Sequence, residues 1–216
     1  MANNLDRRIL LISGASLVLA GCGGLGLGPI DTDNVIYLLE PATKATPGGS
    51  ASPPITWALA VDIPDAPDSL DTRRITLIKA DSTMDYYAKA VWPDRMPLLV
   101  QTALVAGFEA SGRVPQISRT QDALHADYQL STDLRDCTAH YSVPDGAPKV
   151  TVNLVAQMST AHGRKIMATF AASQSASASQ NSTAAVVQAF NQALGAAVDQ
   201  IVGWALSLPP PPPSTP

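Results

Sequence analysis

Few residues of this sequence have the types and the spacing that could support chemistry. The chain contains two cysteines and three histidines, and the one pair at metal-ligand spacing is Cys137-x-x-His140. A structural zinc site uses four ligands, usually as two such pairs, and the sequence has no second pair. The motifs Gly-x-Ser-x-Gly and His-Glu-x-x-His, which mark a nucleophilic serine and a zinc protease, are also missing from it. The sequence therefore indicates a protein that is not an enzyme and binds no metal or cofactor.

Four aspartates follow one another at intervals of three residues in a proline-rich stretch. They are Asp62, Asp65, Asp68 and Asp71. This spacing matches neither a calcium-binding loop nor a pair of catalytic carboxylates. It predicts a solvated connector between two strands.

The position of Cys22, near the start of the chain, predicts a covalent modification of its thiol. Arg7 and Arg8 precede an apolar run from Ile9 to Leu19, which is the layout of a secretory signal and is shorter than the roughly 20 residues of a transmembrane helix. The run ends in Leu19-Ala20-Gly21-Cys22, which resembles the lipobox of bacterial lipoproteins. The resemblance implies cleavage between Gly21 and Cys22 and attachment of a lipid to the Cys22 thiol.

The residues after the lipobox predict a tether and a destination. Residues 22–33 are rich in glycine, and they lack the Lys-Ser/Thr of a phosphate-binding loop, so a flexible spacer is expected. Residue 23 is glycine and not the aspartate that commonly retains lipoproteins in the inner membrane. The expected location is therefore the periplasmic face of the outer membrane, with residues 1–21 removed as a signal peptide.

Charge and cysteine count narrow the range of partners. The formal net charge is −4 and the sequence has no basic stripe, which argues against nucleic acid and against attraction to anionic lipid by charge alone. With Cys22 acylated, Cys137 has no partner for an intramolecular disulfide. Burial of the Cys137 thiol is favoured, and an intermolecular bond is the alternative.

Hydrophobic periodicity between residues 34 and 207 predicts one domain. Alternating apolar residues indicate strands over 35–39, 55–63, 73–79 and 84–91, and then three long successive strands that begin near residues 128, 150 and 166. The apolar positions change parity after Cys137, which predicts a bulge or break between Cys137 and His140. Residues 171–181, rich in serine, alanine and glutamine, are expected to form a loop.

Two amphipathic helices complete the expected domain. One is predicted over 93–111 with Gly112 as its C-cap, and the other runs from Ser182 or Thr183 to about Leu206. Residues 208–216 form a proline-rich tail that cannot continue a helix or a sheet. The expected fold is a single α+β domain in which two amphipathic helices cover a mostly antiparallel sheet.

Several short motifs in this order resemble a known family. They are Tyr37-Leu38-Leu39-Glu40-Pro41, Ala60-Val61-Asp62-Ile63-Pro64, Arg73-Arg74-Ile75 and the Trp92 that opens a helix. With the lipobox, they resemble the ABC-type transport auxiliary lipoproteins of Gram-negative bacteria, over residues 19–206. The chain departs from that pattern at Asp68-Ser69-Leu70-Asp71-Thr72-Arg73, where the family has Leu-Asp-Arg-Pro, and in its proline tail.

The resemblance implies a partner and a role. The family's systems contain an MCE-domain (mammalian cell entry) periplasmic protein, an ABC permease and an ATPase, and they move phospholipid or other hydrophobic molecules across the envelope. The chain would be the non-enzymatic auxiliary component, anchored by its lipid in the outer membrane. Two alternatives stay open: a lipoprotein that assembles a β-barrel or secretion pore, and a periplasmic lipid carrier that acts alone. Free sheet edges would also permit a homo-oligomer.

Overall fold

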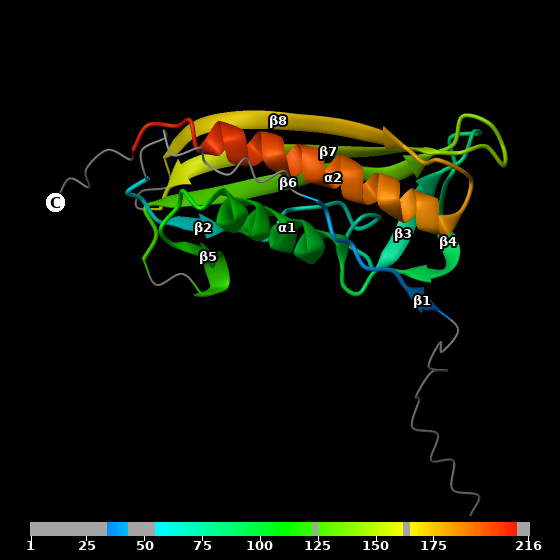
Figure 1. Cartoon of the computed structure of the whole chain (residues 1–216), viewed down its shortest axis with the longest axis horizontal. Helices are drawn as coiled ribbons and strands as arrows, with labels where there is room; N and C mark the ends of the chain where they lie inside the picture. The colour runs from blue at the N-terminus through cyan, green and yellow to red at the C-terminus, as the bar shows by residue number, and fades with distance from the viewer. Residues whose placement is uncertain (1–33, 43–54, 123–124, 162–164, 211–216) are drawn as a thin grey trace, which may run out of the picture. The chain divides into compact units, whose positions relative to one another are not determined.

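The computed structural model describes residues 34–42, 55–122, 125–161 and 165–210 of the 216-residue chain. Within these ranges eight strands form one sheet, and two α-helices pack against it (Figure 1). The expected signal segment, the tether and the residues Gly21 and Cys22 lie outside the described residues, as does the end of the proline tail from residue 211 onward.

Three long strands that follow one another along the chain make the antiparallel part of the sheet. They are β6 (Tyr128–His140), β7 (Lys149–Thr160) and β8 (Ile166–Ser177). On β7, the side chains at even positions from Val150 to Met158 are fully buried, while those at odd positions are more exposed. This is the period-2 pattern of a sheet with one face on the core, and it confirms the three long strands expected from the sequence.

The other edge of β6 is shared by two short strands that run parallel to it. β2 (Leu59–Val61) pairs with the start of β6, and β3 (Arg74–Ile78) pairs with its end, where Leu77 lies opposite Ala139. β4 (Met84–Val91) pairs antiparallel with β3, while β1 (Val35–Ile36) and β5 (Ile117–Arg119) pair parallel with β4 and β2. The α+β class is confirmed, and the sheet is mixed, with antiparallel pairing confined to β3–β4, β6–β7 and β7–β8 of the described strands.

The sheet differs from the expected strand boundaries in two further places. The register of β6 against β7 shifts between Leu134 and Asp136, so the bulge that accounts for the parity change comes before Cys137 and not after it. β8 continues to Ser177, where a loop was expected from residue 171. Its small polar residues are poor strand formers, but they pair with β7 along its full length, so tertiary context overrides propensity.

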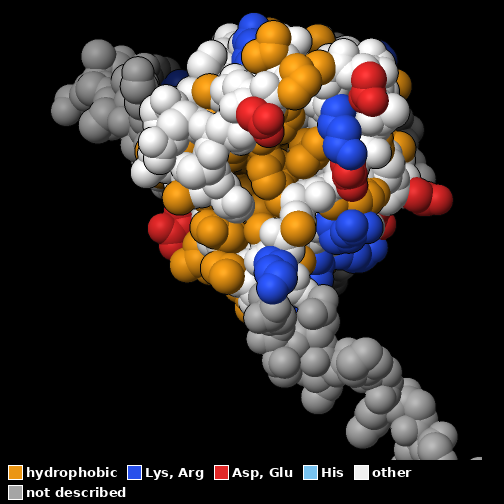
Figure 2. All heavy atoms as spheres, turned by 90° about the vertical axis from the view of Figure 1, so that its right-hand side faces the viewer, with side chains coloured by type: hydrophobic (Ala, Val, Ile, Leu, Met, Phe, Trp, Pro, Cys, Tyr) orange, Lys and Arg blue, Asp and Glu red, His pale blue; other side chains and the backbone are white. Residues whose placement is uncertain are grey.

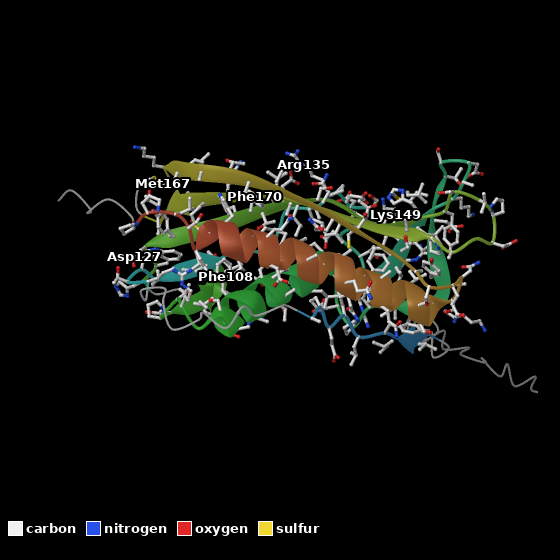
Figure 3. The ribbon with its side chains drawn as sticks, turned by 45° about the horizontal axis from the view of Figure 1, so that its top comes forward. Phe108, Asp127, Arg135, Lys149, Met167 and Phe170 are labelled. Carbon is white, nitrogen blue, oxygen red and sulfur yellow. The ribbon has the colours of Figure 1, made fainter. Side chains whose placement is uncertain are left out.

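The two helices lie side by side on the inner face of the sheet. α1 (Met96–Ser111) lies beside β2 and β5, and α2 (Thr183–Ala205) covers β7 and β8 (Figures 1 and 3). α1 starts later than the predicted residue 93, and its first turn contains Pro97 instead of Pro93. The short 3-10 helix η1 (Thr120–Asp122) follows β5.

The structure contains the two helix caps predicted from the sequence, Ser182 and Gly112. The Ser182 hydroxyl accepts a hydrogen bond from the Ala185 amide, which satisfies one free N–H of the first turn of α2. At the end of α1, Gly112 has a φ of 61° and its N–H donates to the Glu109 carbonyl. Glycine suits this position because it adopts the left-handed conformation without steric cost.

One hydrophobic core connects the helices to the sheet. Trp92 is fully buried and makes an edge-to-face contact with Phe190 of α2 at a centroid distance of 5.4 Å. At the start of β6, Trp57 and Tyr128 form a similar contact at 5.2 Å. The Tyr128 hydroxyl donates to the Pro209 carbonyl, so the first residue of the proline stretch is attached to the domain.

Candidate functional site

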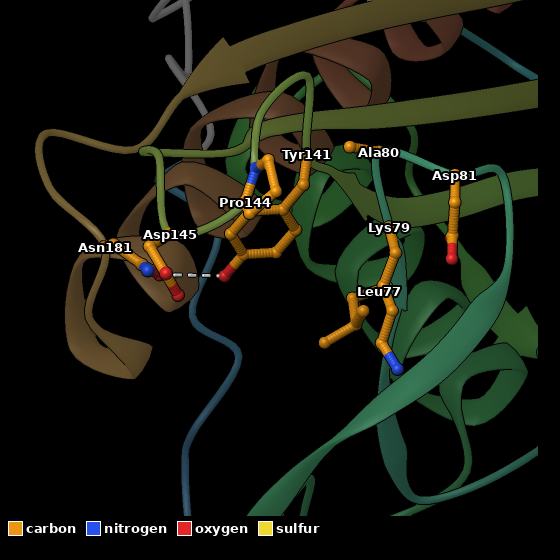
Figure 4. A pocket seen from close by; sticks show the side chains of 8 residues that line it. All are labelled: Leu77, Lys79, Ala80, Asp81, Tyr141, Pro144, Asp145 and Asn181. Carbon is orange, nitrogen blue, oxygen red and sulfur yellow. Dashed lines mark hydrogen bonds between the residues drawn. The ribbon is translucent and has the colours of Figure 1, made fainter.

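A pocket lies at one end of the sheet, between two turns that are far apart in sequence. Because β3 and β6 run parallel and pair at their last residues, the β3–β4 turn and the β6–β7 turn emerge at the same end. The segment before α2 is the third wall, as Figure 4 shows. The pocket has a volume of about 620 Å³, which is within the range of small-molecule sites.

The pocket has an apolar interior and a polar rim. The apolar and aromatic residues that line it are Leu77, Ala80, Tyr141 and Pro144. The other residues that line it are Lys79, Asp81, Asp145 and Asn181. An apolar chain or an apolar side chain of another protein would therefore match the interior, while its polar part would lie at the rim.

A chain of hydrogen bonds fixes the back of the pocket. The Tyr141 hydroxyl donates to Asn181 Oδ1 at 2.9 Å (Figure 4), and its oxygen lies 2.7 Å from the Tyr87 hydroxyl. Because Tyr141 has one hydroxyl hydrogen, Tyr87 must be the donor in the second bond. Burial, together with the bond to Tyr141, raises the pKa of Tyr87 well above its usual range, so Tyr87 stays neutral. The chain joins β4, the end of β6 and the segment before α2.

Charged groups at the rim are paired within the β3–β4 turn. Lys79 Nζ lies 2.5 Å from Asp85 Oδ2, and this contact raises the pKa of Lys79 and lowers that of Asp85. The Asp81 carboxylate accepts hydrogen bonds from the Thr83 hydroxyl and amide, which lower the pKa of Asp81. These groups are exposed, so the pairs shape the turn more than they stabilise the domain.

The two residues at metal-ligand spacing do not meet. Cys137 is buried and lies opposite Val152 on the core side of the sheet, and burial raises the pKa of its thiol. His140 lies on the other side, where Nε2 is 2.7 Å from the Thr138 hydroxyl and 3.2 Å from Asp136 Oδ2. Since the two side chains point to opposite faces of β6, they cannot ligate the same ion. Within the described ranges, no group of three His, Cys, Asp or Glu side chains could hold a metal.

The aspartate-rich stretch is only partly the solvated connector expected from its spacing: Asp65 and Asp68 are exposed, whereas the carboxylates of Asp62 and Asp71 have side-chain partners. The Asp62 carboxylate accepts hydrogen bonds from Gln129, Ser131 and Thr120, so it connects β2 to β6 and to η1. Asp65 continues the pairing, since its amide donates to the Thr132 carbonyl at 2.8 Å and its carbonyl accepts from Leu134. The alternation of apolar residues around Asp62 predicted that its side chain points away from the core. The sequence could not identify its partners, because they are 58 to 69 residues away.

Sequence reasoning also missed the tyrosine chain of the pocket. Tyr87 was expected only as part of a strand, and Tyr141 only as evidence of a parity change. No local pattern could have joined them, because 54 residues separate the two tyrosines and another 40 separate Tyr141 from Asn181.

Comparison with known proteins agrees with the order of the motifs and with the fold. The family model described as "ABC-type transport auxiliary lipoprotein component" matches residues 37–202, which include α1, most of α2 and every strand from β2 onward. The chain belongs to this family of auxiliary lipoproteins. Lipoproteins are anchored to membranes of the cell envelope, and the description of the family names a component auxiliary to ABC-type transport.

Two individual proteins show how far the similarity extends. The crystal structure of protein XCC0632 from Xanthomonas campestris is 28% identical, covers 79% of this chain and 94% of that chain, and superposes with a TM-score of 0.70. An uncharacterized protein of Bradyrhizobium diazoefficiens, bll6063, is 28% identical over 187 residues. That match covers 87% of this chain and 49% of the relative, so the chain spans about half of that protein.

A further crystal structure, of an uncharacterized protein, shares the fold of this auxiliary lipoprotein at 15% identity and a TM-score of 0.56. In the part of the chain that the structure describes, neither helix has the length and hydropathy needed to cross a bilayer.

Proposed function

We propose that this auxiliary lipoprotein is the non-enzymatic, outer-membrane-anchored component of an ABC transport system built around an MCE-domain protein. Its cargo would be phospholipid or another hydrophobic molecule. The observation that carries the proposal is the family match over residues 37–202. The motif Leu19-Ala20-Gly21-Cys22 supports lipid attachment at Cys22, and Gly23 supports sorting to the outer membrane.

The polar groups of the pocket favour binding over catalysis. Lys79 is engaged by Asp85, and Asp81 by Thr83. Tyr141 is held between Tyr87 and Asn181, so its hydroxyl is not paired with a general base. A catalytic site needs a nucleophile or base directed at a substrate, whereas these groups are directed at one another. The site therefore suits recognition of a partner or an amphipathic molecule.

The anchor would hold the domain firmly at the membrane. One acyl chain gives only marginal binding, whereas two or more give stable attachment. Lipobox processing typically supplies more than one chain, so Cys22 alone can account for residence in the outer membrane. The domain would then meet an MCE protein that extends from the inner membrane across the periplasm.

The outer edge of β8 offers a surface for a partner strand or for a second copy of the chain. Among the described strands β8 pairs with β7 alone, and residues 166–177 contain no charged residue and no proline. Soluble proteins usually protect long edges with such residues, so an unprotected edge of 12 residues favours pairing by strand addition. Beside this edge, Phe170 and Trp204 stack at 5.4 Å and remain partly exposed. We infer a homo-oligomer or a β-augmented partner from this edge.

The test is affinity purification of the tagged full-length protein from membranes solubilised in mild detergent. We expect an MCE-domain protein and its permease to copurify. The matched control is Cys22→Ser, which should remove acyl labelling and outer-membrane fractionation in a density gradient. Recovery of a β-barrel protein in place of the MCE protein would contradict the proposal and favour an assembly role. Recovery of neither, with a bound lipid in the mass spectrum, would favour a carrier that acts alone.

A further inference from the structure

Two exposed large hydrophobic side chains lie at the turns that form the pocket. Seven such side chains occur among the described residues; Met84 and Val143 lie beside the two pocket turns, whereas Val35 and Ile36 lie on β1, which pairs with the other end of β4. Met84 begins β4 after the β3–β4 turn, and Val143 lies in the β6–β7 turn with 58% of its surface exposed. Figure 2 views this end directly and shows hydrophobic side chains gathered around a hollow.

The position of β1 relates this end to the expected anchor. β1 pairs with the last residues of β4, and Val91 there lies opposite Arg74 at the start of β3. β1 therefore joins the β3–β4 hairpin at the end away from the turn that lines the pocket, but on the same side of the molecule along its longest axis (Figure 1). About a dozen residues separate Cys22 from β1, and a glycine-rich chain of that length has an end-to-end distance of about 20 Å. β6 alone has 13 residues and is about 43 Å long.

These lengths favour one end of the domain at the bilayer. If Cys22 lies in the membrane, the pocket end is held within reach of the lipid, while the far end of β6 would approach it only by stretching the tether. Stretching a flexible chain beyond its average length costs entropy. The exposed apolar side chains and the length of the tether therefore both favour contact between the pocket end and the bilayer.

The charges at this end permit contact with a lipid surface at shallow depth. The two turns and the first residues of β4 and β7 contain nearly balanced charges, namely Lys79 and Lys149 against Asp81, Asp85 and Asp145. Lys79 and Asp85 neutralise each other in an ion pair. Attraction to the bilayer would therefore come from apolar burial and not from charge. Asp145 lies two residues from Val143, and its carboxylate limits insertion to the level of the headgroups.

We propose that the pocket end of the domain rests on the membrane that holds the lipid anchor, with Met84 and Val143 among the headgroups. The pocket between the two turns then opens toward the lipid. This inference rests on the proposed attachment at Cys22 and adds to it an orientation and a contact surface.

The experiment uses the full-length lipoprotein in vesicles of phosphatidylethanolamine and phosphatidylglycerol that contain a nitroxide-labelled lipid. A fluorescent probe is attached through Val143→Cys or Met84→Cys, and in the control through Ile166→Cys. Ile166 is a matched control because it is 57% exposed and lies where β8 begins, at the opposite end of the sheet. Cys137 is buried and should not react with the probe.

We expect quenching by the nitroxide lipid to be several-fold stronger at positions 84 and 143 than at 166, and to be insensitive to salt. Equal quenching at both ends, or stronger quenching at 166, would overturn the proposed contact. A change at 143 that appears only when the MCE protein is added would overturn it too and assign the surface to a protein. Flotation of the same vesicles is measured first, because failure to float refutes the anchor itself, whereas flotation without selective quenching refutes only the orientation.

Discussion

The Asp62 carboxylate has three side-chain partners from two other elements of the domain. Its carboxylate accepts hydrogen bonds from Gln129 at 2.8 and 2.9 Å, from Ser131 at 2.6 Å and from Thr120. The carboxylate thus adds side-chain contacts with β6 to the backbone hydrogen bond that the Asp62 amide donates to the Leu130 carbonyl. Removing it would leave three polar groups on β6 and η1 without their acceptor.

We predict that Asp62→Ala lowers the free energy of unfolding by about 1–3 kcal/mol, because partly buried donors lose their partner. Urea denaturation followed by circular dichroism measures the change. Asp68→Ala in the same stretch is the control, since Asp68 is exposed in a turn, and its effect should stay within about 0.5 kcal/mol. Equal effects of the two substitutions would contradict the role given to Asp62.

A second prediction at this scale concerns Cys137 and alkaline pH. Burial, and to a lesser extent the charge of Asp136, raises the pKa of Cys137 above its ordinary value of 9.0. The unfolded chain therefore releases this proton at lower pH than the folded chain does. The stability due to the neutral thiol is present below pH 9.0 and is lost as the pH rises above it, by up to about 1.4 kcal/mol per pH unit.

The measurement is the free energy of unfolding between pH 8 and about 9.5, below the ordinary pKa of tyrosine and lysine. Cys137→Ala should flatten the decline in this window. A wild-type curve as flat as that of the variant would show that the thiol is accessible to water in the folded chain.

At the scale of elements, the contact between α2 and the segment after β1 depends on a glycine. A Cβ at Gly195 would lie 2.8 Å from the carbonyl oxygen of Ala42, which is part of the backbone and cannot rotate away. Asn191 on the same helix accepts a hydrogen bond from the Glu40 amide. The helix therefore holds residues 40–42 by close approach as well as by a hydrogen bond.

We predict that Gly195→Ala lowers the free energy of unfolding by about 1–3 kcal/mol through overpacking, despite its better helix propensity. Gly203→Ala on the same helix is the matched control, because a Cβ there would meet nothing within 4 Å. It should raise stability by about 0.5–1 kcal/mol. Thermal or urea unfolding of the two variants measures these changes. Stabilisation by both substitutions would contradict the close contact between Gly195 and Ala42.

The β3–β4 turn is an element with its own pH dependence. Hydrogen bonds from Thr83 lower the pKa of Asp81, and those from Lys79 and Tyr86 lower that of Asp85, below the ordinary value of 3.8. The unfolded chain binds these protons first as the pH falls. The stabilisation of the turn is therefore present above pH 3.8 and is lost as the pH falls through the folded pKa values.

Carboxyl titration by NMR should give midpoints below 3.8 for both aspartates. Thr83→Val removes the hydroxyl donor and should move the midpoint of Asp81 upward, while that of Asp85 changes little. A midpoint for Asp81 that does not respond to this substitution would show that the hydroxyl is not bound to it in solution.

At the scale of the whole molecule, a single hydrophobic core joins both helices to the sheet. Trp57 lies near the start of β6, Trp92 lies between β4 and α1, and Trp204 lies in the last turn of α2. The tryptophans therefore report on distant parts of the same core. Domains with one core commonly unfold in a single cooperative transition.

We predict that tryptophan fluorescence and far-ultraviolet circular dichroism give coincident urea transitions, with equal midpoints and slopes. Variants with a single tryptophan should share that midpoint after correction for the stability cost of each substitution. An earlier transition in the variant that keeps only Trp204 would show that the end of α2 separates before the rest.

Local patterns were sufficient to predict several elements of this protein. The strict alternation of β7, the apolar stripes of α1 and α2 and the caps Ser182 and Gly112 follow from neighbouring residues, because helix and strand periods are properties of the local backbone. The motifs that resemble the auxiliary lipoproteins also lie in short stretches, so the sequence alone predicted the family that the comparison confirms.

Tertiary structure decided the pairing of elements and hence the site. The parallel pairing of β2 and β3 with β6 brings distant turns together, and the side-chain alternation of β6 separates Cys137 from His140. The contacts of Tyr141 with Tyr87 and Asn181 join residues 40 to 54 positions apart. Such contacts depend on strand order and register, which are set by burial of the whole core and leave no pattern in any one segment.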